Sequence, residues 1–299
     1  MIQFSVIVAT LGRPSMLAET LASVVACDPP PLEVLVVDGD PERSAESVTE
    51  GFAKESGPAL RYLSTGRGLT RQRNDGLAAA TGDVVLFIDD DVTVPADTFR
   101  LLAEAFGERA IVGATARILG NRSQLVAPES RLRKFVPGGG REGAFTRYGY
   151  PRYVHHVDQP RDVEYMPGCF MSARRVDAAA VGFDEALVGY ALAEDEDFSY
   201  RLSRRGRIRY LPQLVVDHRL APHTDVSSSA LARSLVINRT YLFHKNFVRT
   251  PIARLQFVGF VVLLGVYRLL ARDVQGARGI VEGVAAVVRN GRAPLDPGT

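Results

Sequence analysis

A regular alternation of short apolar runs and helical patterns is the feature that most constrains the fold of this chain. The apolar, β-branched runs are Phe4–Ala9, Val34–Val37, Val84–Ile88 and Ala110–Ala116. The helical patterns are Met16–Ala26, Ser44–Lys54, Thr70–Ala80 and Ala96–Phe106. Strands that are apolar throughout and alternate with helices favour a parallel sheet covered on both faces. The sequence therefore predicts a doubly wound α/β fold, which binds its ligands at the carboxyl ends of the strands.

Two common nucleotide-binding motifs are missing from the sequence. The first apolar run is followed by TLGRP rather than by G-x-G-x-x-G, and G-x-x-x-x-G-K-[ST] does not occur. A dinucleotide cofactor and a P-loop are therefore not expected.

Carboxylates follow two of the predicted strands directly, at the expected ligand edge. Asp38 ends LVVD, and Asp89, Asp90 and Asp91 end LFIDDD. Two unit charges about 4 Å apart repel by roughly 4 kcal/mol near a protein surface, so either a bound cation or a solvated turn must accommodate them. In extended backbone Asp89 and Asp91 point the same way and Asp90 the other. Hard oxygen ligands of this kind suit Mg²⁺ or Mn²⁺.

A second acidic cluster, Glu194 to Asp197, opens a predicted helix at EDEDFSYRL. Acids in a first helical turn complement the helix macrodipole and need no further role. A catalytic function for this cluster is the alternative, and the spacing alone does not decide between the two.

The charge of the chain divides into an acidic body and a basic tail. Residues 1–227 hold 26 Lys/Arg against 31 Asp/Glu, whereas residues 228–299 hold 10 against 3. We expect residues 228–299 to be helical and associated with an anionic membrane surface. Within this tail, Leu255–Tyr267 has no charge, which fits a helix lying in the membrane interface, a spanning helix or a buried helix. Gln275–Arg289 follows with an amphipathic pattern.

Other features indicate the compartment and exclude one class of partner. Two cysteines, Cys27 and Cys169, do not form a metal or disulfide framework, and no signal peptide is visible. The expected location is cytoplasmic, at the cytoplasmic face of the inner membrane. Residues 120–162 read as a long loop rich in Gly, Pro and Arg, and because they lack an ordered aromatic platform no nucleic acid is expected as partner.

A series of fragments, in order, resembles a family 2 glycosyltransferase of the GT-A fold. These fragments are FSVIVATLGRP, LVVDGD, GLTRQRNDGLAAATGDVVLFIDDDV, PGCFMSARR, GFDEAL and EDEDFSYRLSRRG. The resemblance covers roughly Phe4–His218, and NRTYLFHKNF resembles the tail of many bacterial members. It implies a mostly parallel, Rossmann-like sheet flanked by helices, with residues 1–227 as the catalytic domain.

The resemblance also implies a role for particular residues. The nucleotide sugar is expected to contact Ala9, Thr10, Asp38, Arg73, Asn74, Asp89 and Asp90. A divalent cation, Mn²⁺ or Mg²⁺, is expected at Asp91, Asp89 and His218, with Asp91 as the direct ligand. For His218 a place in the core or facing solvent is the alternative. Asp195 is the implied catalytic base, with Glu194 beside it.

These roles imply transfer of a sugar from a nucleotide-diphosphate sugar to a glycan or lipid-linked acceptor. One base and no candidate nucleophile imply a single displacement with inversion. Two alternatives are a non-catalytic, membrane-docked protein that binds nucleotide sugars and a sugar-nucleotide nucleotidyltransferase. Leu11-Gly12 and Gly39-Asp40 depart from the usual family pattern, which leaves the nucleotide open.

Overall fold

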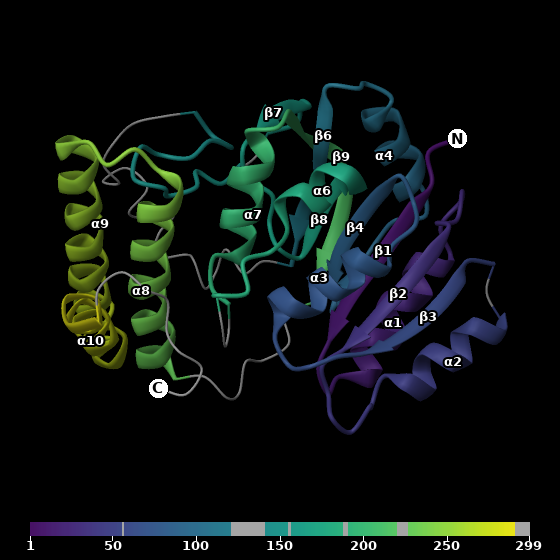
Figure 1. Cartoon of the computed structure of the whole chain (residues 1–299), viewed down its shortest axis with the longest axis horizontal. Coiled ribbons are helices and arrows are strands. Elements are labelled where there is room, and N and C mark those ends of the chain that lie inside the picture. Colours follow the sequence, from purple (N-terminus) through teal and green to yellow (C-terminus); the bar gives the residue numbers. More distant parts are fainter. Residues whose placement is uncertain (56, 121–140, 155–156, 188–190, 220–226, 291–299) are drawn as a thin grey trace.

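The computed structural model describes residues 1–55, 57–120, 141–154, 157–187, 191–219 and 227–290 (Figure 1). Its strands are β1 (Phe4–Thr10), β2 (Glu33–Asp38), β3 (Ala59–Ser64), β4 (Val84–Asp89), β5 (Val92–Thr93), β6 (Ile111–Leu119), β7 (Arg161–Val163), β8 (Phe170–Arg174) and β9 (Arg207–His218). Its helices are α1 (Pro14–Val25), α2 (Glu46–Glu55), α3 (Leu69–Ala79), α4 (Thr98–Phe106), α6 (Arg175–Val181), α7 (Glu194–Ser203), α8 (Ser228–Asn246), α9 (Pro251–Leu270) and α10 (Val274–Asn290).

One mixed sheet joins all of these strands in the order β3-β2-β1-β4-β8-β6-β9-β5, with β7 paired to β9. Strands β3, β2, β1 and β4 are parallel, as are β6 and β9, whereas β8 runs antiparallel between β4 and β6. The prediction of a mostly parallel, Rossmann-like sheet is confirmed. Strands β5, β7 and β8 pair antiparallel with their neighbours. For β5 and β8 this fits the short connections that precede them, since a parallel pairing needs a long crossover.

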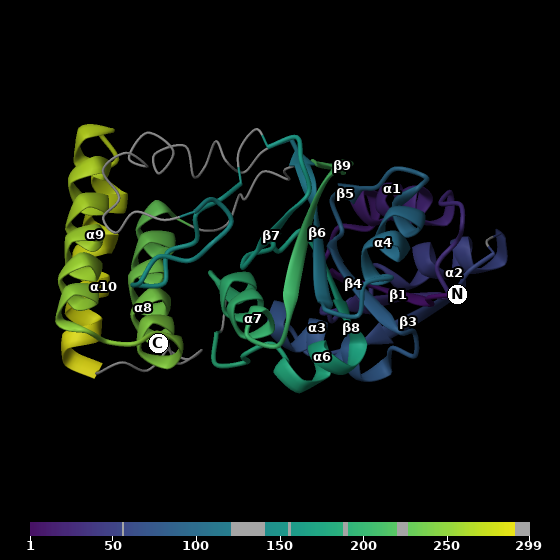
Figure 2. The same ribbon diagram turned by 90° about the horizontal axis from the view of Figure 1, so that it is seen from above.

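Helices cover both faces of the sheet, as the turned view shows (Figure 2). Successive residues of the central strands belong to different hydrophobic clusters on these faces. Val6, Val8 and Leu86 pack in one cluster with α1 and α4, whereas Ile7 and Phe87 pack in another with α3, α6 and α7. Because both faces are buried, the strands carry apolar residues throughout, and this pattern made them recognisable in the sequence. Strand β3 was missed because it lies at the sheet edge and is only partly buried.

The C-terminal helices form a third hydrophobic cluster beside the sheet. In both views α8 lies between α7 and the pair α9–α10 (Figures 1 and 2). Ala232, Val236, Phe260 and Ile280 from these helices pack together with Tyr148 and Tyr150, which precede β7. The tail therefore shares its core with part of the preceding chain, and the division at residue 227 stays a prediction.

Helix α9 exposes most of its surface. It is the one helix among the described residues that is long and apolar enough to cross a membrane, and only 17% of its apolar window is buried. This exposure excludes the interpretation of Leu255–Tyr267 as a buried helix. The interpretations of this segment as an interfacial or a spanning helix stay predictions.

Helix α3 lies unusually close to the sheet at Gly76, one turn after Arg73. A Cβ added at Gly76 would lie 2.5 Å from Ile7 Cγ2 and 3.0 Å from Val37 Cγ2. Both neighbours are β-branched and buried in the sheet, so they have little room to move. A glycine at this position therefore sets the distance between α3 and strands β1 and β2.

We predict that Gly76→Ala destabilises the protein by about 1–3 kcal/mol through overpacking. Gly51→Ala in α2 is the matched control, because a Cβ there meets nothing within 4 Å. It should stabilise the protein by about 0.5–1 kcal/mol, since Ala has less conformational entropy to lose. Urea unfolding of both variants measures the difference. Equal effects would mean that the close approach at Gly76 has no energetic consequence.

Candidate active site

Two aspartates and one histidine meet at the carboxyl end of the sheet. Strand β5 returns the chain after Asp91 and pairs Val92 with His218 at the end of β9. His218 Nε2 therefore lies 3.0 Å from Asp91 Oδ1 and 3.9 Å from Asp89 Oδ2. Ligand atoms of all three residues lie within 4.8 Å of one another. Two carboxylates and one imidazole in this arrangement fit a divalent cation, and His218 lies in the cluster rather than in solvent.

Asp90 lies in a turn with Asp91 rather than in extended backbone, and its partners are Thr10 and Arg13. Its carboxylate accepts hydrogen bonds from Thr10 Oγ1 at 2.6 Å and Arg13 Nε at 3.2 Å. Burial raises the pKa of Asp90 to about 7, although Arg13 and Thr10 act in the opposite direction. Arg13 also contacts Asp91 Oδ2 at 3.3 Å. Asp90 is fully buried, so in this structure it orients Thr10 and Arg13 rather than facing solvent.

Arg73 connects the two acidic clusters. Its guanidinium donates to Asp89 Oδ1 at 3.0 Å, to Glu194 Oε1 at 2.9 Å and to the carbonyl oxygen of Gly168 at 2.9 Å. The side chain is only 2% exposed. The planar fork of Arg suits such a bridge better than the point charge of Lys.

Glu194 and Asp195 lie side by side but in different surroundings. Burial and the nearby charge of Asp195 raise the pKa of Glu194 to about 7, although Arg73 opposes the shift. Asp195 Oδ2 accepts hydrogen bonds from Tyr165 Oη at 2.7 Å and from the Gly168 amide at 2.9 Å. The residue before this pair, Ala193, adopts the left-handed conformation with φ 73°. Strained backbone of this kind is concentrated at functional sites.

The other two acids of the second cluster also have partners outside their own helical turn. Glu196 accepts two hydrogen bonds from Arg239 of α8, at 2.9 and 2.7 Å. Asp197 accepts from Lys245 at 3.0 Å and Asn246 at 2.8 Å, also of α8. The helix macrodipole is therefore not the only interaction of this cluster, because side chains of α8 also bind the first turn of α7.

Two predicted contacts of the nucleotide sugar lie apart from the metal cluster. Asp38 is fully buried at the end of β2, where its carboxylate accepts from the amides of Asp40 and Ala45 and from Tyr62 Oη. Asn74 bonds with the backbone of Phe183 and with Glu185. Ala9 is buried next to Thr10 in β1. Their contacts to a nucleotide sugar stay predictions.

Arg13 and Tyr165 are site residues that sequence reasoning missed. Arg13 carries a signal, since it lies three residues after the first strand, at the ligand edge. Tyr165 carries none, because its contact with Asp195 depends on how the chain between β7 and β8 folds. Residues 121–140 and 155–156 of the predicted loop 120–162 lie outside the described residues.

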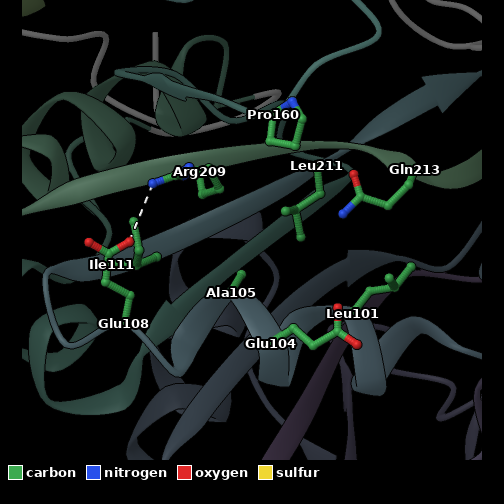
Figure 3. Close-up of a pocket in the computed structure, with 9 residues that line it drawn as sticks. All are labelled: Leu101, Glu104, Ala105, Glu108, Ile111, Pro160, Arg209, Leu211 and Gln213. Carbon is green, nitrogen blue, oxygen red and sulfur yellow. Dashed lines mark hydrogen bonds and ion pairs between the residues drawn. The ribbon is translucent and has the colours of Figure 1, made fainter.

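A pocket of about 230 Å³ lies at a different place, along the first halves of β6 and β9 beside α4 (Figure 3). Its charged residues already form ion pairs: Arg209 with Glu108 at 3.4 Å, and Glu104 with Arg100 at 2.7 Å. This pocket contains none of the predicted site residues, and we assign no chemistry to it.

Part of the chain is similar in sequence to known proteins. Residues 5–179 match the family model described as Glycosyl transferase family 2. The chain is 39% identical over 113 residues to the succinoglycan biosynthesis protein ExoM of Rhizobium meliloti, covering 36% of each chain. It is 28% identical over 142 residues to a GalNAc(5)-diNAcBac-PP-undecaprenol beta-1,3-glucosyltransferase of Campylobacter jejuni, covering 47% of this chain and 44% of that protein. The matches thus span less than half of these relatives.

Solved structures share the fold over most of the chain. The mannosyltransferase PcManGT of Pyrobaculum calidifontis, in complex with GDP-Man and Mn²⁺, has a TM-score of 0.59 at 17% identity. The match covers 97% of this chain and 76% of that one. TarS of S. aureus in complex with UDP-GlcNAc has a TM-score of 0.54 at 18% identity, over 97% of this chain and 93% of that one. The expected GT-A fold is confirmed.

We predict that Asp91→Asn lowers Mn²⁺ affinity by at least tenfold, because it removes one negative oxygen ligand from a three-residue cluster. Titration calorimetry of the sugar-free protein with MnCl₂ measures this directly. Asp97→Asn, which changes an exposed acid paired only with Arg100 in α4, is the control and should bind Mn²⁺ like the wild type. Unchanged Mn²⁺ affinity of Asp91→Asn would place the cation elsewhere.

Proposed function

Because the chain belongs to glycosyltransferase family 2, we propose that it transfers a sugar from a nucleotide-diphosphate sugar to a hydroxyl of a glycan or lipid-linked acceptor. The observation that carries this proposal is the bridge made by Arg73, which joins the Asp89–Asp91–His218 cluster to Glu194 and so to Asp195. A cation site would bind the donor and the candidate base would bind the acceptor. Held together in this way, the two sites suit a reaction between donor and acceptor.

The residues that would hold the cation for the donor diphosphate are Asp89, Asp91 and His218. Such a cation acts as a Lewis acid that neutralises the charge of the leaving nucleotide. Arg13 is about one third exposed and lies against Asp91, so its guanidinium is available to the same diphosphate. Thr10 and Asp90 orient Arg13 from the buried side.

Asp195 would accept the proton of the acceptor hydroxyl as general base. Tyr165 and the Gly168 amide occupy one of its carboxylate oxygens and thereby fix its direction. Among the described residues of this site no side chain is a candidate covalent nucleophile, and this supports a single displacement with inversion. Glu194 would act through Arg73, by keeping the guanidinium against Asp89.

The outer faces of α9 and α10 support a membrane location. Their exposed apolar residues are Ile252, Leu255, Val258, Val262, Val266, Leu269, Leu270, Val274, Val281, Val284 and Val288. Exposed arginines accompany them, among them Arg254, Arg272 and Arg278. Apolar side chains flanked by cations suit an anionic bilayer surface. Relatives named for dolichyl phosphate and undecaprenol substrates also favour a lipid-linked acceptor. We place this acceptor at the cytoplasmic face of the membrane.

We predict that Asp195→Asn lowers transfer by about 10²- to 10⁴-fold, the usual contribution of a general base. The assay follows nucleotide release from UDP-, GDP- and dTDP-sugars with Mn²⁺, using octyl glycosides or water as acceptor. Donor affinity, measured by calorimetry with Mn²⁺ present, should stay within a few-fold of wild type. Excess EDTA should abolish release by the wild type.

Asp97→Asn again serves as the control for the change of a carboxylate to an amide. Glu196→Gln is unsuitable for this purpose, because Glu196 is buried against Arg239. Near-normal release by Asp195→Asn would mean that another residue is the base. Full activity in EDTA would mean that the mechanism needs no divalent cation.

We also predict that Leu255→Glu combined with Val262→Glu weakens sedimentation with anionic vesicles of phosphatidylglycerol by at least tenfold. These residues are 74% and 59% exposed and lie seven apart, on one face of α9. The matched control is Leu32→Glu with Val176→Glu, two exposed apolar residues of residues 1–227, which should sediment like the wild type. Equal sedimentation of both double variants would argue against a membrane contact through α9.

A further inference from the structure

Two separate supports reach the first turn of α7 from outside the helix. One is the hydroxyl of Tyr165, which donates to Asp195. The other is Arg239 of α8, which makes two hydrogen bonds to Glu196, the residue next to Asp195. Arg239 and Glu196 are both buried. The paired geometry of the Arg–carboxylate contact fixes direction as well as distance.

Aromatic contacts connect these two supports to each other. The ring of Tyr165 lies 5.2 Å from that of Tyr153 with the planes at 83°, and Tyr153 lies 6.3 Å from Tyr150. The guanidinium of Arg239 lies over the ring of Tyr150, at 5.0 Å. The contacts therefore form a closed ring that begins and ends at adjacent residues of α7. Edge-to-face and cation–π geometries of this kind restrict the orientation of each member.

Phe260 of α9 packs against two neighbouring members of this ring of contacts, Tyr150 and Arg239. Its side chain is 2% exposed and lies 4.8 Å from the ring of Tyr150 and 5.9 Å from the guanidinium of Arg239. Together with Ala253 and Leu264 it makes up the buried residues of α9, a helix that otherwise exposes apolar residues. Phe260 thus links α9 directly to Arg239 and, through Tyr150 and Tyr153, indirectly to Tyr165.

We propose that Tyr165, Arg239 and Phe260 are positioning residues, which hold Asp195 in the direction needed to accept a proton from the acceptor. This inference rests on the proposed role of Asp195 as base. It makes the C-terminal helices part of the apparatus that activates the acceptor, and not only an attachment. A base that is displaced by about 1 Å can lose up to 10²-fold in rate, so loss of either support should lower kcat without weakening the binding of the donor.

Tyr165→Phe is the sharpest test, because it removes one hydroxyl and keeps the ring. We expect kcat for nucleotide release to fall about tenfold or more, with donor affinity within twofold of wild type. Tyr241→Phe is the matched control, since Tyr241 donates its hydrogen bond to Asp184 rather than to Asp195. In the double variant Asp195→Asn with Tyr165→Phe, the rate should equal that of Asp195→Asn alone, because Tyr165 acts only through Asp195. Additive losses would overturn the positioning role.

Phe260→Leu tests the connection to α9 in the same assay. We expect a several-fold lower kcat, unchanged donor affinity and partial recovery in Phe260→Tyr, which restores the ring. Phe243→Leu, a buried phenylalanine of the same cluster in α8, controls for lost packing and should retain kcat. Equal kcat in the two Leu variants would contradict the role of Phe260. If Asp195→Asn is inactive while Tyr165→Phe and Phe260→Leu keep full activity, only this inference fails. If Asp195→Asn is active, the proposed base itself is wrong.

Discussion

The site depends on one buried cation of the chain itself, the guanidinium of Arg73. It bridges Asp89 and Glu194, which lie 105 positions apart in the sequence, and it is nearly inaccessible to solvent. Asp195 adds a further carboxylate beside Glu194, so the acids in this region outnumber the guanidinium that pairs with them. Charges in a buried region must be compensated by partners or by a change of protonation. Burial, and after it the charge of Asp195, raises the pKa of Glu194.

The fold brings these groups together through strand ends rather than through local sequence. Parallel β1 and β4 place Thr10 and Asp89 at the same edge, and the short antiparallel pairing of β5 with β9 brings His218 to Asp91. Helix α3 approaches the sheet closely because Gly76 has no side chain. This close approach holds Arg73 next to Asp89, at the carboxyl end of the sheet. Each acid therefore keeps a fixed orientation before any ligand binds. Such preorganisation is what electrostatic stabilisation of a transition state requires.

Features set by local alternation could be predicted from the sequence, and features set by distant packing could not. The buried strands follow from their apolar runs. By contrast, Arg13 reaches Asp90 across 77 residues, and Tyr165 reaches Asp195 across 30, so that distant packing and not a local pattern brings each pair together. Edge strand β3 lacked the apolar run of a central strand. The contact of Arg73 with a nucleotide sugar stays a prediction, and the resemblance did not indicate that its partners would be acids of both clusters.

Helix α9 has two faces with different physical demands, and this difference explains its unusual composition. Its outer face carries branched apolar residues that a soluble protein would rarely leave exposed as a continuous patch. Its inner face uses Ala253, Phe260 and Leu264, of which Phe260 contacts both Tyr150 and Arg239. A rigid helix that met a bilayer on one side, as proposed, and the supports of α7 on the other would couple the two mechanically, because a displaced Phe260 would disturb the packing of Arg239. Under these proposals, contact with a membrane and orientation of Asp195 would both depend on the position of α9.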